Sequence, residues 1–510
     1  MEATEEKEVV TTAEKLTEQD SYSKIFKSSF LIGGSQVFNI IIGIIKNKAL
    51  AVLLGPAGIG VMGVYMAVSG LITSTAGLGI GSSGVRQISE SIAEGNAGKT
   101  SFIIRYIRKL LLISAIIAVV AMIATSEYIA RLSFGNEYKP AYVAGISLVS
   151  LMVFFETLTT GEKAILQGAR QLRRLAVAQV VGAMLGAVGS IAIVYLLADA
   201  GISWFLIISS FLLFAVFRYQ AAKVPASAKS VLPQEIVRSE KKLLISLGLA
   251  FLVTTLAGSV VAYILRVIIV AEEGVDGVGI YQAAWGLVNM GFNVVLIAMG
   301  TDFYPRLVAV ANDNKQVRQA VNQQVEVTLL FALPIVLGLY LLSPIILEIF
   351  FSPQFLVGTE LTRWFALSCF LRVLCWPLGY IIIAKAKKTM FVVTSILWEM
   401  VHIPIIFVCL HFWGLNGIGI SYVIDYLVVL VGASFITYKY FNFTWSNDTY
   451  KSVAISVLLV AGIVLLNVLH VKPIIFYLTG ALLIGISLFR MVIIAQKKLG
   501  INLVNYIRRR

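Results

Sequence analysis

Residues 55–61 read GPAGIGV and residues 274–280 read GVDGVGI, the same Gly-x-x-Gly-x-Gly pattern 219 positions apart. The pattern returns as GLNGIGI at 414–420, and GIS at 201–203 is a degenerate fourth copy. Each copy joins two long apolar stretches. A dinucleotide-binding loop would instead need a preceding β-strand. Glycine permits a tight turn and close helix packing because it has no Cβ. We therefore expect helical hairpins at Gly55, Gly58, Gly60, Gly274, Gly277, Gly279, Gly414, Gly417 and Gly419.

The composition excludes a soluble protein. Of 510 residues, 58% are hydrophobic and 13% are charged, with a mean hydropathy of +0.89, whereas soluble domains carry about 25% charged residues. Apolar runs of about 20 residues recur, each long enough to cross ~30 Å of hydrocarbon as a helix. We expect an all-α polytopic membrane protein with about fourteen transmembrane helices, over residues 25–54, 58–82, 102–124, 141–158, 175–197, 200–217, 243–270, 279–301, 324–351, 359–383, 389–412, 416–436, 452–469 and 474–494.

The distribution of positive charge sets the orientation. Of 41 Lys and Arg residues, 33 fall in segments that are cytoplasmic if the N-terminus is inside, and the outer loops hold only Arg131, Lys139 and Lys472. Cytoplasmic loops of membrane proteins concentrate Lys and Arg. Both termini should therefore face the cytoplasm. The net charge of +14 has this explanation, so no nucleic-acid partner is expected.

The glycine repeat predicts two lobes. We expect an acidic, disordered cytoplasmic tail at 1–24, an N-lobe of six helices at 25–217, and a basic cytoplasmic linker at 218–242. A C-lobe of six helices follows at 243–438, with two extra helices and a basic cytoplasmic end at 439–510. Because six helices separate the first two glycine motifs, the lobes share one orientation and should relate by an axis along the membrane normal, as in many transporters.

Polar residues within the spans mark a candidate substrate cavity. A charged side chain at the bilayer centre is unfavourable by ~2.5–3.5 kcal/mol on insertion scales, so each needs a polar cavity or a partner. Lys46 and Arg266 lie at matched depth, nine and eight residues before their glycine motifs, although either could instead extend to lipid phosphates. Arg363 and Arg372 lie on opposite helix faces, so at most one lines a cavity. The candidates are Gln36, Asn39, Lys46, Asn47, Arg266, Gln282, Asn289, Asn293 and Arg372.

Acidic residues and a histidine within the spans are candidates for ion coupling. Glu399 and His402, at i and i+3, can touch on one helix face. They form either a satisfied intramembrane pair or a protonation site, since histidine titrates near physiological pH. Asp425 is a third candidate, with H⁺ or Na⁺ as the ion. Glu156 lies near a cytoplasmic helix end and is expected to be structural. The three cysteines form no CxxC pair and accompany no His cluster, so neither a metal nor a cofactor is expected.

The sign of the buried charge favours one substrate class. Cations and amides on the facing surfaces of two lobes suit an anionic substrate with many hydroxyl groups. An exporter of cationic drugs would instead need carboxylates and aromatic side chains there, and the first span carries no carboxylate.

Three segments resemble a known family. They are LGPAGIGVMG (54–63), YQAAWGLVNMGFNVVLIAMGTDFYPRL (281–307) and GYIIIAKAKKTMF (379–391). They are similar to the Wzx-type O-antigen and enterobacterial common antigen translocases of the multidrug/oligosaccharidyl-lipid/polysaccharide (MOP) exporter superfamily, over about residues 25–436. The resemblance implies a MATE-like pair of lobes in the bacterial inner membrane. It also implies a flippase for undecaprenyl-pyrophosphate-linked oligosaccharide, working beside polysaccharide polymerase machinery, with no enzymatic chemistry.

Two other functions remain open from the residues. A multidrug efflux antiporter of the same superfamily predicts dye export, and the cationic first span argues against it. A membrane glycosyltransferase or polymerase acting on the same lipid would need a substantial outer loop with catalytic residues. The longest outer loop, about 125–140, offers only Glu127, Arg131, Glu137 and Lys139.

Overall fold

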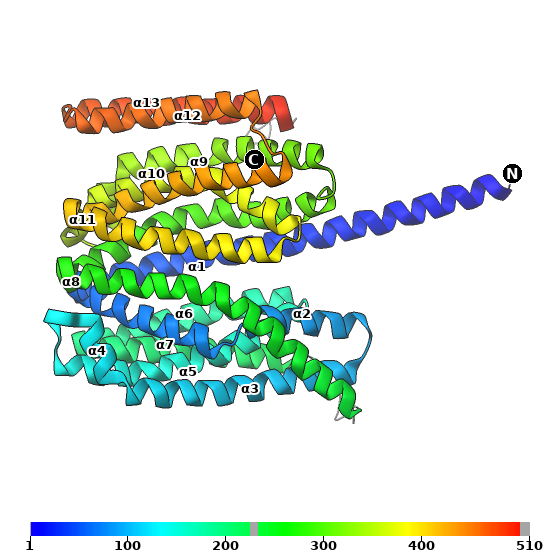
Figure 1. Cartoon of the computed structure of the whole chain (residues 1–510), viewed down its shortest axis with the longest axis horizontal. Coiled ribbons are helices and arrows are strands. Elements are labelled where there is room, and N and C mark those ends of the chain that lie inside the picture. Colours follow the sequence, from blue (N-terminus) through cyan, green and yellow to red (C-terminus); the bar gives the residue numbers. More distant parts are fainter. Residues whose placement is uncertain (1, 225–232, 500–510) are drawn as a thin grey trace. The chain divides into compact units, whose positions relative to one another are not determined.

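The computed structural model describes residues 2–224 and 233–499. The side chains of residues 2–37, 190, 250, 293–302, 305, 388, 495 and 497–499 fall outside this description. Within these ranges every regular element is a helix (Figure 1): α1 (Glu2–Ala76), α2 (Ile80–Ala93), α3 (Ala97–Ala124), α4 (Ser126–Phe134), η1 (Gly135–Glu137), α5 (Pro140–Gly168), α6 (Leu172–Leu197), η2 (Ala198–Ala200), α7 (Gly201–Ala222), α8 (Gln234–Ala309), α9 (Asn314–Phe350), η3 (Pro353–Gly358), α10 (Thr359–Ala384), α11 (Lys388–Phe441), α12 (Asn447–Val468) and α13 (Pro473–Leu499).

The first glycine of each motif breaks a long helix. Gly55 in α1, Gly274 in α8 and Gly414 in α11 have φ of 63°, 74° and 54°, each with an extended ψ. That backbone region is essentially restricted to glycine, because a Cβ would clash there. The chain reverses at these points (Figure 1). Near the degenerate fourth copy the positive φ falls on Ala198, three residues before Gly201, at the junction of α6 and α7.

The helices are long and apolar enough for a polytopic membrane protein. Ten candidate spans are found among the described residues, by length and hydropathy. Four of the ten each contain two membrane-length segments, because they run through a break at Gly55, Gly274, Gly414 or the α6–α7 junction. Dividing these four gives fourteen segments, which agrees with the number expected from the sequence.

The first of two compact units contains residues 1–54, 65–132 and 138–260. Within it α3, α5, α6 and α7 pack as neighbours. The first part of α8 joins them, since Lys99 forms a 2.9 Å salt bridge with Glu240 and Gln87 donates to the Glu240 carbonyl at 3.1 Å. These bonds explain why the division between the units falls within α8, after Val260, and not in the 218–242 linker proposed as the lobe boundary.

The second unit contains residues 55–64, 133–137 and 261–510. In it α9 packs against α10, and α10 against α11. The two C-terminal helices, α12 and α13, lie side by side (Figure 1) and both pack against α9. A buried polar group supports this attachment: Asn322 of α9 accepts bonds from the Ser446 amide (2.7 Å) and the Thr449 hydroxyl (2.8 Å) at the start of α12.

Three segments differ from the sequence expectation. Helix α1 begins at Glu2, so residues 2–24, expected as a disordered tail, are helical, with acidic residues at the helix start where the macrodipole favours them. Helix α8 begins at Gln234, within the expected linker. The outer loop 125–140 contains helix α4, which carries an exposed Glu127–Arg131 pair at i and i+4.

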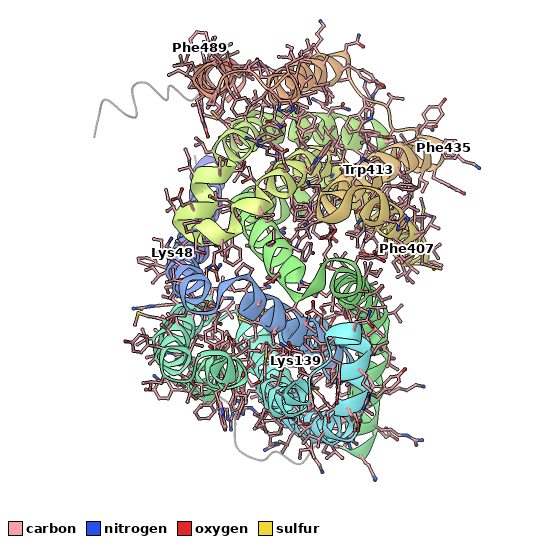
Figure 2. All side chains as sticks on the ribbon, turned by 90° about the vertical axis from the view of Figure 1, so that its left-hand side faces the viewer. Lys48, Lys139, Phe407, Trp413, Phe435 and Phe489 are labelled. Atoms are coloured by element: carbon pink, nitrogen blue, oxygen red, sulfur yellow. The ribbon has the colours of Figure 1, made fainter. Side chains whose placement is uncertain are left out.

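Large apolar side chains cover the outside of the helices. Phe407, Trp413, Phe435 and Phe489 project outward (Figure 2) and are 54–68% exposed. A soluble protein rarely leaves so much contiguous apolar surface open to water. In a membrane these side chains contact lipid, so their exposure is the expected state of a polytopic protein.

Candidate functional site

A helical hairpin in the second unit brings a cation and an amide together. Arg266 donates from Nη2 to Gln282 Oε1 at 3.1 Å and from Nη1 to the Ala262 carbonyl at 2.7 Å. The two side chains are 16 residues apart, which is ~24 Å along an unbroken helix. They meet because each lies eight residues from Gly274, where α8 reverses. The Arg266 Nε lies buried without a hydrogen-bond partner among the described residues.

A second cation binds the same segment of α8. Arg372 of α10 donates to Asn289 Oδ1 at 3.2 Å, and Asn289 Nδ2 donates to the Trp285 carbonyl at 3.0 Å. Gln282 and Asn289 are seven residues apart, two helical turns, and so lie on one face. Arg266, Gln282, Asn289 and Arg372 together form what we call the arginine–amide face. All four residues are partly exposed.

Neither arginine of this face has an acidic partner among the described residues. No described carboxylate forms a salt bridge with Arg266 or Arg372. A guanidinium carries five N–H donors in a planar fork that matches a phosphate or carboxylate. Each arginine therefore keeps donors and a full positive charge available for an anion.

Aromatic side chains line the arginine–amide face. The Arg266 guanidinium carbon lies 5.3 Å from the centre of the Tyr281 ring. Trp285 packs on Tyr422 at 4.7 Å and on Phe365 at 5.2 Å between ring centres. Rings beside a cation fix its orientation through the ring quadrupole. This group comes from α8, α10 and α11, and none of its aromatic residues is among the candidates named from the sequence.

Arg363, nine residues before Arg372, has a structural role. It is 9% exposed and donates to the Tyr340 carbonyl at 3.3 Å, to Asn467 Oδ1 at 2.8 Å and to Glu360 at 2.5 Å. These bonds connect α10 to α9 and α12. The two arginines thus use opposite faces of α10, as their spacing predicts.

The candidates on α1 have fewer polar contacts. Lys46 lies in the first unit with its Nζ 5.8 Å from the centre of the Phe205 ring. Asn39 Oδ1 is buried without a hydrogen-bond partner among the described residues, and Asn47 is partly exposed. The side chains of Gln36 and Asn293 lie outside the described residues. The role of Lys46 in a substrate cavity therefore remains a prediction.

The first unit contains a cavity of about 470 Å³. Its lining is drawn from α1, α5, α6 and α7: Asn39, Thr73, Glu156, Thr159, Thr160, Lys163, Gln179, Ala183, Ser210, Leu213 and Phe217. Glu156 accepts a hydrogen bond from the Thr73 hydroxyl at 3.2 Å. Sequence reasoning assigned Glu156 a structural role. The structure places it in the cavity wall, seven residues before Lys163 and hence on the same helix face.

The ion-coupling candidates gather on the two arms of α11. His402 lies 3.5 Å from the Ser421 hydroxyl and 4.5 Å, between ring centres, from Tyr422. No described hydrogen bond joins His402 to Glu399, although their spacing allows one. Asp425 instead lies within electrostatic range of Glu399, and its Oδ1 is buried without a hydrogen-bond partner among the described residues. No group of three or more His, Cys, Asp and Glu side chains suited to a metal is found among the described residues.

Comparison with known proteins places this geometry in a family. The family model described as "Polysaccharide biosynthesis protein" matches residues 49–359, which is more than half of the chain. The chain belongs to this family. The matched region contains the first two glycine motifs and the two charged cavity-lining residues of α5, Glu156 and Lys163. It also contains Arg266, Gln282 and Asn289 of the arginine–amide face. A search of curated proteins finds no match.

Solved structures share the fold of this family member. The lipid II flippase MurJ in an inward closed conformation aligns with a TM-score of 0.70 and 15% identity, over 92% of this chain and 99% of its own. An inward-facing multidrug resistance MATE family transporter of the MOP superfamily aligns at 0.65 and 18% identity, over 79% and 94%. A MOP superfamily transporter from Pyrococcus furiosus aligns at 0.59 and 18% identity, over 82% and 97%. The protein has the MOP-superfamily fold.

Proposed function

We propose that the protein is a flippase that moves an undecaprenyl-pyrophosphate-linked oligosaccharide, an O-antigen or related surface polysaccharide repeat unit, across the bacterial inner membrane. The arginine–amide face carries this proposal. Moving a bare diphosphate into hydrocarbon is unfavourable by tens of kcal/mol. Arg266 and Arg372 can replace the water around it, because no carboxylate that the structure describes neutralises either of them. The similarity of the fold to MurJ, a lipid II flippase, supports the same substrate class.

In this proposal the side chains bind and release, and no covalent bond is made or broken. Arg266 and Arg372 hold the diphosphate oxygens, Gln282 and Asn289 orient the two guanidinium groups, and Lys46 adds a third cation. The polyprenyl chain stays in lipid. Alternating exposure of the two lobes moves the headgroup from the cytoplasmic to the periplasmic leaflet, with both protein termini in the cytoplasm. Polysaccharide polymerase machinery would take up the product.

A deletion experiment tests this function. Deleting the gene should make lipid-linked oligosaccharide accumulate on the cytoplasmic leaflet, and the wild-type gene should clear it. Arg266→Ala and Arg372→Ala should each fail to clear it while inserting at normal levels. Lys139→Ala, whose side chain lies at the surface (Figure 2), is the control and should restore fully. Full restoration by both arginine variants would contradict the proposal.

Coupling to an ion gradient is a second part of the proposal. Glu399 and Asp425 lie on the two arms of α11 within electrostatic range of each other, where a proton or Na⁺ bound at one carboxylate would lower the repulsion on the other. Transport by the wild type should then fall when the gradient is collapsed. Asp425→Asn should transport at a reduced rate that no longer depends on the gradient. Unchanged gradient dependence in this variant would remove Asp425 from the coupling.

The chief alternative is a multidrug antiporter, since MATE transporters share the fold. It predicts export of cationic dyes. The paired aromatic rings of Trp285 and Tyr422 would suit such a ligand, but the uncompensated arginines beside them would repel it. The family assignment and this charge both favour the lipid-linked glycan.

A further inference from the structure

The cavity of the first unit combines polar groups with an apolar wall. Eight of its eleven lining residues carry polar side chains, but most of the wall that faces the space is formed by apolar atoms, including those of Ala183, Leu213 and Phe217. Small-molecule sites commonly have this combination of an apolar lining with a few placed polar groups. In a membrane protein, a polar recess between helices is energetically unfavourable unless it is filled by water or by a polar ligand.

Part of the hydrogen-bonding capacity in this cavity is unused, whereas the Thr159, Thr160 and Ser210 hydroxyls donate to carbonyls of their own helices. The Glu156 carboxylate can accept about four hydrogen bonds and accepts one described bond from a side chain, that of Thr73. Asn39 Oδ1, on a different helix, is buried without a described partner. Gln179 and Lys163 bring donors from α6 and α5, and no described salt bridge joins Lys163 to Glu156. The cavity therefore offers acceptors and donors from three helices at once.

The size of the cavity points to an organic ligand. A water occupies about 30 Å³ of liquid volume, and cations such as Ca²⁺ are held by oxygens at about 2.3–2.6 Å. The cavity measures about 470 Å³, within the range of about 300–1,000 Å³ typical of small-molecule sites. Its lining holds one carboxylate and one ammonium, so the ligand need carry no net charge.

We propose that this cavity binds one or two sugar residues of the transported glycan. A sugar hydroxyl both donates and accepts a hydrogen bond, which matches the mixture of Glu156, Asn39, Gln179 and Lys163. The apolar face of a pyranose ring can pack on Phe217. This inference rests on the proposed function, and it assigns recognition of the glycan to a site separate in sequence from the arginine–amide face.

A soluble probe separates the glycan from its diphosphate. Mild acid hydrolysis of the host's lipid-linked oligosaccharide releases the free oligosaccharide, without diphosphate or prenyl chain. Calorimetry with the purified full-length protein in detergent should show that the wild type binds it. Arg266→Ala and Arg372→Ala should bind it equally well, because their loss affects only the diphosphate.

Two variants of the cavity should weaken this binding. Glu156→Ala should weaken it about tenfold, the factor expected from loss of one hydrogen bond to a charged group. Ala183→Leu should weaken it at least as much by filling the space, while leaving every polar group in place. Val188→Leu is the matched control, because Val188 lies on the same helix and is 69% exposed. Thermal melting of each variant shows that it is folded.

The outcomes distinguish the two proposals. If the wild type binds the oligosaccharide and Glu156→Ala and Ala183→Leu bind it with unchanged affinity, the cavity assignment is wrong and the flippase proposal stands. If Arg266→Ala alone abolishes binding, the glycan binds at the arginines and the cavity assignment is again wrong. If the wild-type protein binds no oligosaccharide and deletion of its gene causes no accumulation of lipid-linked glycan, both proposals fail.

Discussion

Gly60 lies directly against the backbone carbonyl of Val275, and Gly279 lies in the same way against the carbonyl of Pro56. A Cβ on either glycine would overlap that carbonyl. In both cases the sixth residue of one glycine motif meets the second residue of the other. The two copies of the repeat, 219 residues apart, thus pack on each other as pseudo-equivalent partners. The motif is repeated because each copy provides the surface that the other requires.

This contact predicts a stability effect at two remote positions. Gly60→Ala and Gly279→Ala should each lower the free energy of unfolding by about 1–3 kcal/mol, as overpacking does, because a rigid backbone carbonyl cannot move aside as a side chain would. Thermal unfolding in detergent measures this. The control is Gly338→Ala in α9, where no atom lies within 4 Å of the added Cβ, and it should melt at or above the wild-type temperature. Equal melting of all three variants would exclude the close packing.

The two arginines of α10 should behave differently on substitution. Arg363→Ala leaves Asn467 and the Tyr340 carbonyl without their donor, so it should lower the melting temperature and detach α12 from α10. Arg372→Ala removes a charge that pairs with no carboxylate in the described part of the chain, so it should leave the melting temperature nearly unchanged and abolish transport. Melting and glycan accumulation, measured on both variants, test this. A stable but inactive Arg363→Ala, or an unfolded Arg372→Ala, would reverse the assignments.

Glu162 should be needed for folding of the first unit. Its buried carboxylate forms a two-bond pair with Arg108, at 2.9 and 2.7 Å, and a further bond with Arg218 at 3.3 Å. Removing one partner of a fully buried pair costs about 3–5 kcal/mol. The cost here is lower, because the side chains of Arg108 and Arg218 are 28% and 47% exposed and solvent screens their charges. Glu162→Ala should still express poorly or melt early. Glu127→Ala, which breaks the exposed pair with Arg131, should leave stability nearly unchanged, because solvent screens both charges. Equal stability of the two variants would show that the Glu162 pair is screened by solvent.

Most of the fold follows from the sequence because hydropathy and glycine act locally. The Gly-x-x-Gly-x-Gly motifs mark the breaks in α1, α8 and α11, and the apolar runs give the number of membrane segments. The extent of the helices beyond the membrane was not predicted. Helix α8 extends back to Gln234 because Glu240 binds Lys99 and Gln87, and no local pattern reports contacts made at that distance along the chain.

The candidate site was predicted only in part. The contact between Arg266 and Gln282 follows from their equal distance to Gly274, and could have been predicted once the turn was placed. In the first hairpin, the residue that lies as far after Gly55 as Lys46 lies before it is Val64. This hairpin therefore places no side-chain amide opposite Lys46. Tyr422 and Phe365 join the site through packing of three helices, which periodicity on one helix cannot reveal. The cavity that Glu156 lines was not predicted, because the depth of a residue along one helix does not show which helices face it.

Translocation by the purified protein tests the central claim most directly. The protein is reconstituted in liposomes with a fluorescent undecaprenyl-pyrophosphate-linked oligosaccharide, and a membrane-impermeant quencher reports how much of it changes leaflet. The account predicts rapid translocation by the wild type and by Lys139→Ala, and none above protein-free liposomes by Arg266→Ala or Arg372→Ala. Wild-type rates in both arginine variants, or no translocation by the wild type, would contradict it.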